Sequence, residues 1–312
     1  MQISTQIKQV KGGTTLIEYM AKRFTYRSIE EWNTLIVAGN ILLNGKSVAP
    51  ESAVNAGDVI ATLMPDPEKP DANFSYTIVY EDEVLVGVNK PPNLRVHGRG
   101  RFIHANLIHH IRHDRQPPYP GVDLVNRLDA NSSGLILLAK DKATMGYMQA
   151  LFRERSITKK YLALVSGIPQ PGEGVVERPI GQLPSAEGVY RFGDGPDAIK
   201  VKLAATRYRV LATYQDRYAL VECMPVTGRT HQIRVHMQML GCPLVGDWLY
   251  QLSDEAYLER VRSETPNEDP VLSRHALHCA AYRFIHPLSR NEVEIEAPLV
   301  EDMAFLISSL QA

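Results

Sequence analysis

The stretch NRLDANSSGLILLAK, from Asn126 to Lys140, decides how the rest of the chain is interpreted. It places Arg127 and Asp129 two residues apart and follows them with a polar Asn-Ser-Ser-Gly turn. The apolar run from Leu135 to Ala139 then predicts a buried strand. A carboxylate at the open end of a rigid strand is well placed to act as a nucleophile or general base. The structural alternative is that Asp129 caps the turn while Arg127 neutralises it as a surface ion pair.

The composition predicts an ordinary globular protein. The chain has 312 residues, 44% of them apolar, enough for one large or two modest domains. Its first residues, MQISTQIKQVKGG, lack the apolar core of a signal peptide, and no apolar run approaches the length that spans a bilayer. The three cysteines, Cys223, Cys242 and Cys279, form no CxxC pair, which argues against a disulfide framework or a thiolate zinc site. We therefore expect a reduced, cytoplasmic setting without membrane contact.

The net charge of -1 hides an uneven distribution of charge along the chain. Residues 89–160 hold 13 Lys or Arg against 5 Asp or Glu, whereas residues 251–312 hold 5 against 11. The middle of the chain is therefore where a polyanion is expected to bind. The alternative is that these charges fold onto different faces and cancel. The basic segment also carries five histidines: His97, His104, His109, His110 and His113.

Residues 14–63 predict a small module of two helices and a hairpin. Apolar residues recur there at three- and four-residue spacing in two successive segments. The Asn44-Gly45 pair after a short strand is a strong hairpin signal, and Gly57-Asp58 precedes a final strand over 59–63. The helical positions are Leu16, Ile17, Tyr19 and Met20, followed by Ile29, Trp32, Leu35 and Ile36.

This module resembles an S-four-like RNA-binding unit, in which the pattern G-x-hydrophobic-x-N-G-K precedes G-D-hydrophobic-I. The alternative is a small domain used for packing or dimer contact. A stiff segment with three prolines follows the module. We therefore expect an RNA-binding module over residues 1–64, a Pro-rich linker over 65–73 and a catalytic domain over 74–312. The resemblance implies phosphate contacts by Lys22, Arg23, Arg27 and Lys46.

The catalytic domain is expected to alternate strands and helices. Hairpins are predicted from 76–80 with 84–88 and from 206–211 with 218–223, and a strand from 161–165. Helices are predicted over 103–113, over 142–155 and after Thr227-Gly228. Residues 175–202 predict only a variable excursion rich in Gly and Pro.

Five motifs resemble, in order, those of RluA-type pseudouridine synthases. The stretch at Asn126 resembles HRLD-x-x-TSGLLL, with Asn126 where the family usually has His and Ser132 where it usually has Thr. Residues 88–97 resemble VNKP-x-G-x-x-VH, with Asn93 where Gly is common. The others are K-x-Y-x-A-x-V-x-G at 159–167, GRTHQIRVH-x-x-x-x-G-x-P-x-x-GD-x-x-Y at 228–250, and R-x-x-LH with F-x-HP at 274–287.

The resemblance implies an α+β fold with a mixed, mostly antiparallel sheet, flanking helices and a central cleft. It implies an isomerase that converts a uridine of rRNA or tRNA into pseudouridine, without a metal or redox cofactor. Asp129 would be the catalytic carboxylate, Tyr161 the active-site aromatic, and Arg229 the partner that pairs with Asp129. We expect a monomer whose only macromolecular partner is RNA. The implied RNA contacts in this domain are Arg127, Lys90, His97, Lys160, His231, Gln232 and Arg234.

The sequence leaves the chemical route and two other functions open. The carboxylate can attack the sugar's anomeric carbon, add to carbon six of the base, or stabilise the charge that develops as the glycosidic bond breaks. The first alternative function is an RNA-binding protein that keeps the fold without catalysis, which Asn126 in place of His leaves open. The second is a metal-dependent hydrolase that uses the His-rich helix over 103–113, where residues four apart share a face.

Overall fold

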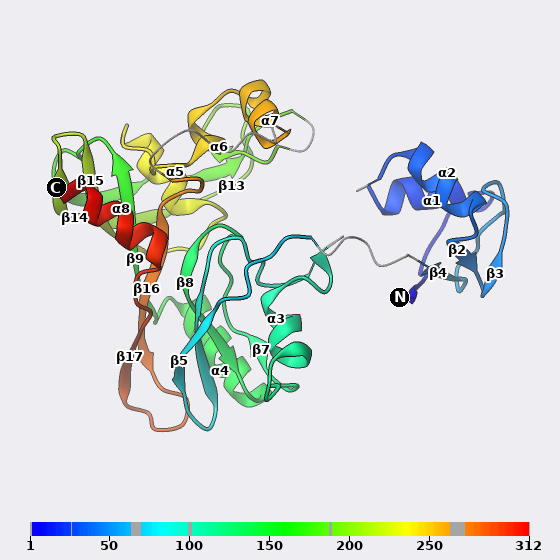
Figure 1. Ribbon diagram of the computed structural model, residues 1–312, viewed down its shortest axis with the longest axis horizontal. Helices are drawn as coiled ribbons and strands as arrows, with labels where there is room; N and C mark the ends of the chain where they lie inside the picture. Colours follow the sequence, from blue (N-terminus) through cyan, green and yellow to red (C-terminus); the bar gives the residue numbers. More distant parts are fainter. Residues whose placement is uncertain are drawn as a thin grey trace. The chain divides into compact units, whose positions relative to one another are not determined.

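The computed structural model describes residues 2–25, 27–63, 70–98, 102–186, 189–262 and 272–311. The chain divides into a smaller unit within residues 1–70 and a larger unit built from residues 71–98 and 104–312 (Figure 1). Most of the predicted linker over 65–73 lies outside the described residues.

The smaller unit is a four-stranded antiparallel sheet with two helices, α1 (Leu16–Arg23) and α2 (Ile29–Val37). Each helix begins with a capping box, on Thr15 and Ser28, which satisfies backbone N–H groups at the helix start. Buried Trp32 lies in the core between the helices and the sheet. The predicted helices and the hairpin are confirmed. The strands are β1 (Gln2–Gln6), β2 (Ile41–Leu43), β3 (Lys46–Ser47) and β4 (Val59–Leu63), in the order β1-β4-β2-β3.

The larger unit is built on a ten-stranded sheet in which every pairing is antiparallel except that of β8 with β16. The main order is β10-β14-β15-β9-β16-β8-β6-β5, with β17 beside β16 and β7 beside β8. The expected α+β class is therefore confirmed. The strands are β5 (Thr77–Glu81), β6 (Leu85–Lys90), β7 (Asp123–Leu124), β8 (Ser133–Ala139), β9 (Thr158–Ser166), β10 (Glu173–Glu177), β14 (Ala205–Tyr214), β15 (Tyr218–Pro225), β16 (Leu277–Ile285) and β17 (Glu292–Glu296).

The strand after the Asn126 stretch, β8, is buried along its whole length. It lies between β6 and β16, and α4 (Lys142–Glu154) packs beside it. Gly134 has a φ of +106°, and a Cβ at this position would lie 2.2 Å from the Cys279 carbonyl oxygen. Only glycine therefore lets β8 approach β16 this closely.

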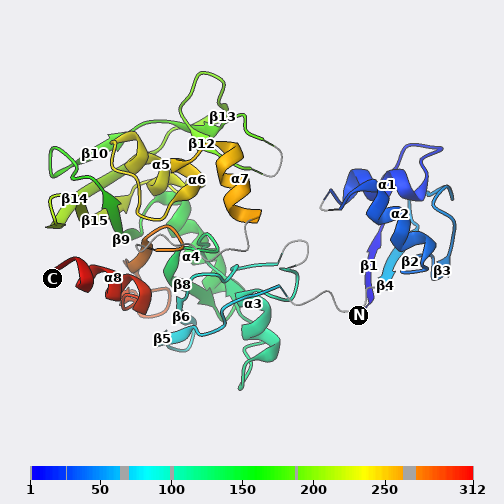
Figure 2. The ribbon, with the colours of Figure 1, turned by 45° about the horizontal axis from the view of Figure 1, so that its top comes forward.

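Two helices cover opposite faces of the sheet. Ile233 and Met237 of α5 (Gln232–Met239) pack with Ala163 and Val165, whereas α8 (Glu301–Gln311) packs on Leu164. Successive residues of a strand point to opposite faces, so α5 and α8 lie on different sides of β9 (Figure 2). The short helix α6 (Trp248–Gln251) and α7 (Asp254–Arg262) follow α5 in the chain. Among the described helices, none has the length and apolar character needed to cross a membrane.

Two segments differ from the sequence prediction. Residues 103–113 form only a short helix, α3 (Leu107–His109), and a π-helical turn over His110–Asp114, because Asn106 caps the His109 N–H and starts the helix late. The excursion over 175–202 contains β10 and a separate three-stranded sheet in the order β12-β11-β13. Its strands are β11 (Ile180–Gln182), β12 (Phe192–Gly193) and β13 (Ile199–Lys202).

Candidate active site

Asp129 lies in the turn that precedes β8, and its side chain is 35% exposed. Its carbonyl oxygen accepts the Ser132 N–H at 3.2 Å, which closes the predicted polar turn. The carboxylate is therefore fixed next to a fully buried strand while it remains open to a ligand.

Arg234 is the arginine that contacts Asp129. Its Nη1 lies 3.4 Å from Asp129 Oδ2, while its Nε and Nη2 donate to the two oxygens of buried Asp247 at 2.7 Å each. A guanidinium held by two parallel hydrogen bonds has a fixed orientation. Asp247 thus aims Arg234 at the Asp129 carboxylate.

The expected pairing of Arg229 with Asp129 is wrong. Arg229 lies before α5, and its Nε donates to the Leu203 carbonyl oxygen at 3.0 Å. The helix begins at Gln232, so Arg234 falls in its first turn and faces the interior, where it is 6% exposed. The same motif supplied both arginines, but the start of the helix decides which one reaches the carboxylate.

His231 and Tyr250 complete the surroundings of Asp129 on the α5 side. His231 Nε2 lies 3.8 Å from Asp129 Oδ2, and His231 Nδ1 lies 2.8 Å from the Tyr250 hydroxyl. Burial, reinforced by the Arg234 cation, lowers the pKa of His231 to about 4. The imidazole is therefore neutral near pH 7, so it belongs to the surroundings of Asp129 and is not a cationic phosphate contact.

Tyr161 enters the site from β9. Its hydroxyl oxygen lies 3.3 Å from that of Tyr282 on β16. Burial raises the pKa of the Tyr161 phenol well above its ordinary value, and the charge of Asp129 contributes in the same direction. Tyr161 is thus a neutral phenol near Asp129, where it can stack on a base or donate a hydrogen bond.

Two residues expected to bind RNA are instead part of the scaffold. Lys90 is 0% exposed, and its ammonium donates to the carbonyl oxygens of Pro91 and Ala130 at 2.8 and 2.9 Å. Gln232 is 4% exposed and accepts hydrogen bonds from the Arg229 N–H and the Thr227 hydroxyl. These predictions are wrong because both side chains satisfy backbone groups inside the fold. Lys90 thereby holds the residue that follows Asp129.

The remaining basic positions are more accessible. Arg127 and His97 are exposed, whereas Lys160 lies on the face of β9 opposite Tyr161 and pairs with Glu294 at 3.4 Å. Lys160 is therefore wrongly assigned to RNA at this site, since adjacent strand residues face opposite sides. Arg234, also expected to touch RNA, is buried in its pair with Asp247. In the smaller unit, Lys22, Arg23 and Lys46 are exposed, and Arg27 is half-buried against Trp32 and Glu31.

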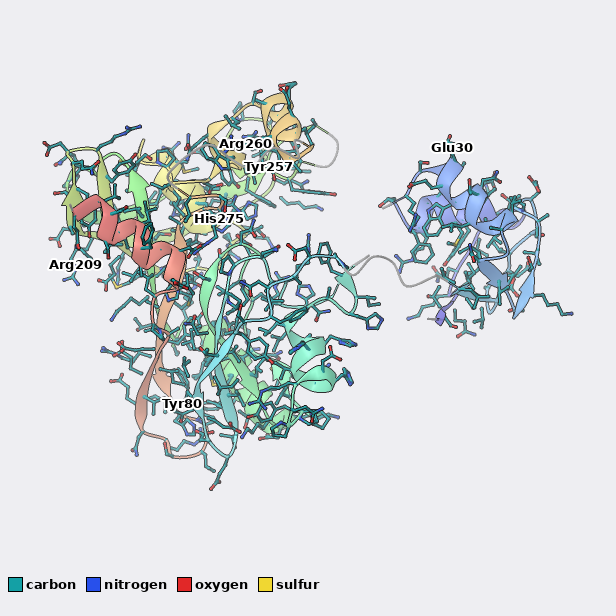
Figure 3. The ribbon with its side chains drawn as sticks, in the orientation of Figure 1. Glu30, Tyr80, Arg209, Tyr257, Arg260 and His275 are labelled. Atoms are coloured by element: carbon teal, nitrogen blue, oxygen red, sulfur yellow. The ribbon has the colours of Figure 1, made fainter. Side chains whose placement is uncertain are left out.

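The turn after Asp129 is also held from the C-terminal motif. Arg274 donates to the Asn131 carbonyl oxygen at 3.1 Å and pairs with Asp302. His275 Nε2 lies 2.8 Å from the Ser132 hydroxyl, and His278 Nδ1 lies 3.0 Å from that of Ser133. Figure 3 marks His275 near the end of β8. Burial lowers the pKa of both histidines, so they act as neutral hydrogen-bonding groups that fix this turn.

Sequence reasoning missed Asp247, Tyr250, Tyr282 and the role of Asn126. The first two stand in the GD-x-x-Y end of the α5 motif, so the motif signal for them was present. Tyr282 lies in no quoted motif, and only the pairing of β9 with β16 brings it to Tyr161. In the described part of the chain, no cluster of three or more His, Cys, Asp or Glu residues could hold a metal ion.

The site can be compared with known proteins. A family model described as RNA pseudouridylate synthase matches residues 84–239, which include the turn with Asp129, Tyr161 and the whole of α5. The Bacillus subtilis protein named uncharacterized RNA pseudouridine synthase YlyB is 31% identical over 293 residues, 91% of this chain and 88% of its own. Ribosomal large subunit pseudouridine synthase C of Vibrio cholerae is 35% identical over 276 residues, 84% of this chain and 82% of its own.

Solved structures agree with the sequence relatives. Human RNA pseudouridylate synthase domain containing 4 superposes with a TM-score of 0.57 at 29% identity, over 75% of this chain and 92% of that one. Human RNA pseudouridylate synthase domain containing 1 gives 0.57 at 27% identity, over 78% and 97%. The fold and the site therefore define an RNA-modifying isomerase. The chain belongs to the RNA pseudouridylate synthase family.

Proposed function

We propose that this pseudouridine synthase isomerises a uridine of large-subunit ribosomal RNA, with Asp129 as the catalytic carboxylate. The relatives from Vibrio cholerae and Escherichia coli are named for the large ribosomal subunit, and each aligns over more than four fifths of both chains. The observation that carries the catalytic assignment is the partly exposed Asp129 carboxylate before the start of β8, which contacts Arg234, itself held by Asp247.

The reaction rearranges bonds without adding or removing atoms. The N1–C1′ glycosidic bond breaks, the base turns, a C5–C1′ bond forms, C5 loses a proton and N1 gains one. Asp129 either attacks C1′, adds to C6, or stabilises the positive charge that develops on the sugar. In each route Arg234 keeps the carboxylate oriented, and in the two covalent routes it also stabilises the negative charge when the carboxylate leaves again.

The target base must leave its stack to meet Asp129. Flipping a base costs a few kcal/mol, and side chains that fill the vacated space offset part of this cost. Arg127 is exposed two residues before Asp129, which suits it to that position. Tyr161 would then lie against the flipped uracil, since an aromatic ring can stack on a base and its hydroxyl can donate to it.

The smaller unit would bind RNA outside the active site. Its exposed Lys22, Arg23 and Lys46 are available to phosphates, and linked binding units raise the local concentration of substrate. We further propose a monomer that works in the cytoplasm, where ribosomal RNA would be its substrate.

Comparison of cellular RNA with and without the gene tests the substrate. Pseudouridine mapping should find a position in large-subunit ribosomal RNA that loses its modification when the gene is deleted and regains it when the wild-type gene is restored. Loss confined to tRNA would contradict the proposed substrate. Failure of the Asp129→Asn gene to restore the mark is expected, and Asp216→Asn in the exposed turn after β14 is the matched control.

A further inference from the structure

A chain of hydrogen bonds runs from β8 to Tyr161 through Asn126, the residue that differs from the family pattern. Asn126 is 9% exposed. Its Oδ1 accepts the Leu137 N–H at 2.8 Å, and its Nδ2 lies 3.0 Å from the Tyr282 hydroxyl and 3.5 Å from the Leu135 carbonyl oxygen. The Tyr282 hydroxyl in turn lies 3.3 Å from that of Tyr161.

This chain of hydrogen bonds has a direction. A backbone N–H can only donate, so the Leu137 N–H fixes the oxygen of the Asn126 amide toward β8. The amide nitrogen must then donate to Tyr282. Because the Tyr282 oxygen already accepts this hydrogen bond, its own proton is available to the Tyr161 oxygen. With Tyr282 as the donor, Tyr161 receives a hydrogen bond on the Tyr282 side, and its own proton is left for another acceptor.

The surroundings favour a neutral chain. Tyr282 is 1% exposed, and burial raises the pKa of both phenols well above the ordinary value. The other titratable or charged groups that face the pair are Cys279 on β16, Lys159 on β9 with Arg155 beside it, and Asp129. Burial raises the pKa of Cys279 to about 12 and lowers that of Lys159 to about 8. The Cys279 thiol is a weak acceptor and competes poorly for the Tyr161 proton.

We propose that Asn126 is a positioning residue: it sets the direction of the Tyr282–Tyr161 hydrogen bond, so that the Tyr161 hydroxyl donates to the bound uracil. This inference rests on the proposed function, in which Tyr161 lies against the flipped base. An amide performs the task at any pH, because it accepts from Leu137 and donates to Tyr282 without a change of protonation. A histidine in its place can do both only as the neutral imidazole.

Two replacements of similar size should respond to pH in opposite ways. In Asn126→Asp, the carboxylate present at high pH would accept the Tyr282 proton, and Tyr282 would then accept from Tyr161. The Tyr161 donor is lost to the substrate, which lowers kcat by about tenfold to a hundredfold. At low pH the protonated carboxyl donates to Tyr282 as the amide does, so kcat recovers. In Asn126→His, kcat stays within about threefold of wild type at pH 8. It falls as the imidazole protonates, because the imidazolium can no longer accept the Leu137 N–H and so loses the contact that holds it beside Tyr282.

The experiment measures steady-state kcat and KM on the RNA substrate from pH 5.5 to 9. Each constant of the variant is divided by that of wild type at the same pH. The titration of Lys159 affects both proteins equally, so its effect cancels in this ratio. We expect a falling kcat ratio for Asn126→Asp with rising pH and a nearly constant KM. In the Tyr282→Phe background, Tyr161 can no longer donate to residue 282, so Asn126→Asp should no longer lower kcat.

Three results would contradict the role of Asn126 or that of Tyr161. A flat kcat ratio for Asn126→Asp across the pH range, or the same loss in the Tyr282→Phe background, would overturn the inference. If Asn126→Asp does not fold, the Asn126→His profile decides, and a pH-independent ratio there would overturn it. Tyr161→Phe tests the proposed function separately: full kcat in that variant would remove the role of Tyr161, whereas loss of kcat there with a flat Asn126→Asp ratio would refute only the role of Asn126.

Discussion

Around Asp129, three charged side chains that match the family pattern are buried and bound to protein atoms, whereas Arg127 and basic side chains of the smaller unit face solvent. Lys90, Arg234 and Arg274 are at most 6% exposed, and each contacts a carboxylate or a backbone carbonyl. Lys22 and Lys46 are exposed. Buried charge next to Asp129 therefore builds and orients the site, while the exposed charge of Arg127 and of the smaller unit is accessible from solvent.

The largest effect is expected from Arg234, measured against Arg229. Arg234→Lys loses the two parallel bonds to Asp247 and the contact to Asp129, and a single ammonium cannot replace both. We expect kcat to fall by about 10²- to 10³-fold. Arg229→Lys, in the same motif, should change kcat by less than about threefold, because the Arg229 side chain donates to a backbone carbonyl outside the surroundings of Asp129. Tritium release from RNA labelled at uridine C5 measures kcat of both variants. An equal loss of kcat in the two variants would contradict the assignment of Arg234 as the partner of Asp129.

The contrast between Arg234 and Arg229 also shows what could not be predicted from the sequence. Periodicity predicted the strand that follows Asp129, the hairpins and the helix over 142–155, because apolar residues there follow the spacing of the element. It could not decide between Arg229 and Arg234, because the left-handed backbone of His231, with a φ of +55°, delays the start of α5. β1 was missed since its residues are nearly all polar.

The sequence also did not predict which polar groups are buried. Lys90 follows an apolar strand, and its charge suggested a phosphate contact, yet the fold encloses it and supplies two carbonyl acceptors. Tyr282 joins the site only through the pairing of β9 with β16, a contact between residues more than a hundred positions apart. Local patterns carry no information on such long-range partners.

A moderate effect on stability is expected from the buried Lys90. Burial lowers its pKa to about 7 from an ordinary 10.5. Between these values the unfolded chain binds a proton that the folded chain has released, so stability rises with pH in this window. The free energy of unfolding of wild type relative to that of Lys90→Met should therefore rise from pH 7 to pH 9, by on the order of 1 kcal/mol per pH unit. Thermal melts at several pH values measure this difference in stability, and Lys160→Met, at a half-exposed position, is the control. A difference between wild type and Lys90→Met that stays constant with pH would contradict the lowered pKa of Lys90.

The smallest effect on turnover is expected from the basic residues of the smaller unit. The triple variant Lys22→Ala, Arg23→Ala and Lys46→Ala should leave kcat at saturating RNA within about twofold, since none of these residues belongs to the site. RNA affinity should fall, and the slope of log K against log salt should become shallower by about two to three. Titrations at several salt concentrations measure the slope. If RNA affinity and the salt slope are unchanged, the smaller unit is a packing or interaction domain and does not bind the RNA.

The most direct test of the central claim is turnover by Asp129→Asn. The variant has nearly the same shape and keeps the neighbouring Arg234–Asp247 pair, so the change removes the carboxylate chemistry and little else. In a single-turnover assay on its RNA substrate, we expect no pseudouridine above background, with RNA affinity within about tenfold of wild type. Pseudouridine formation by the purified variant at a rate near that of wild type would contradict the catalytic role of Asp129.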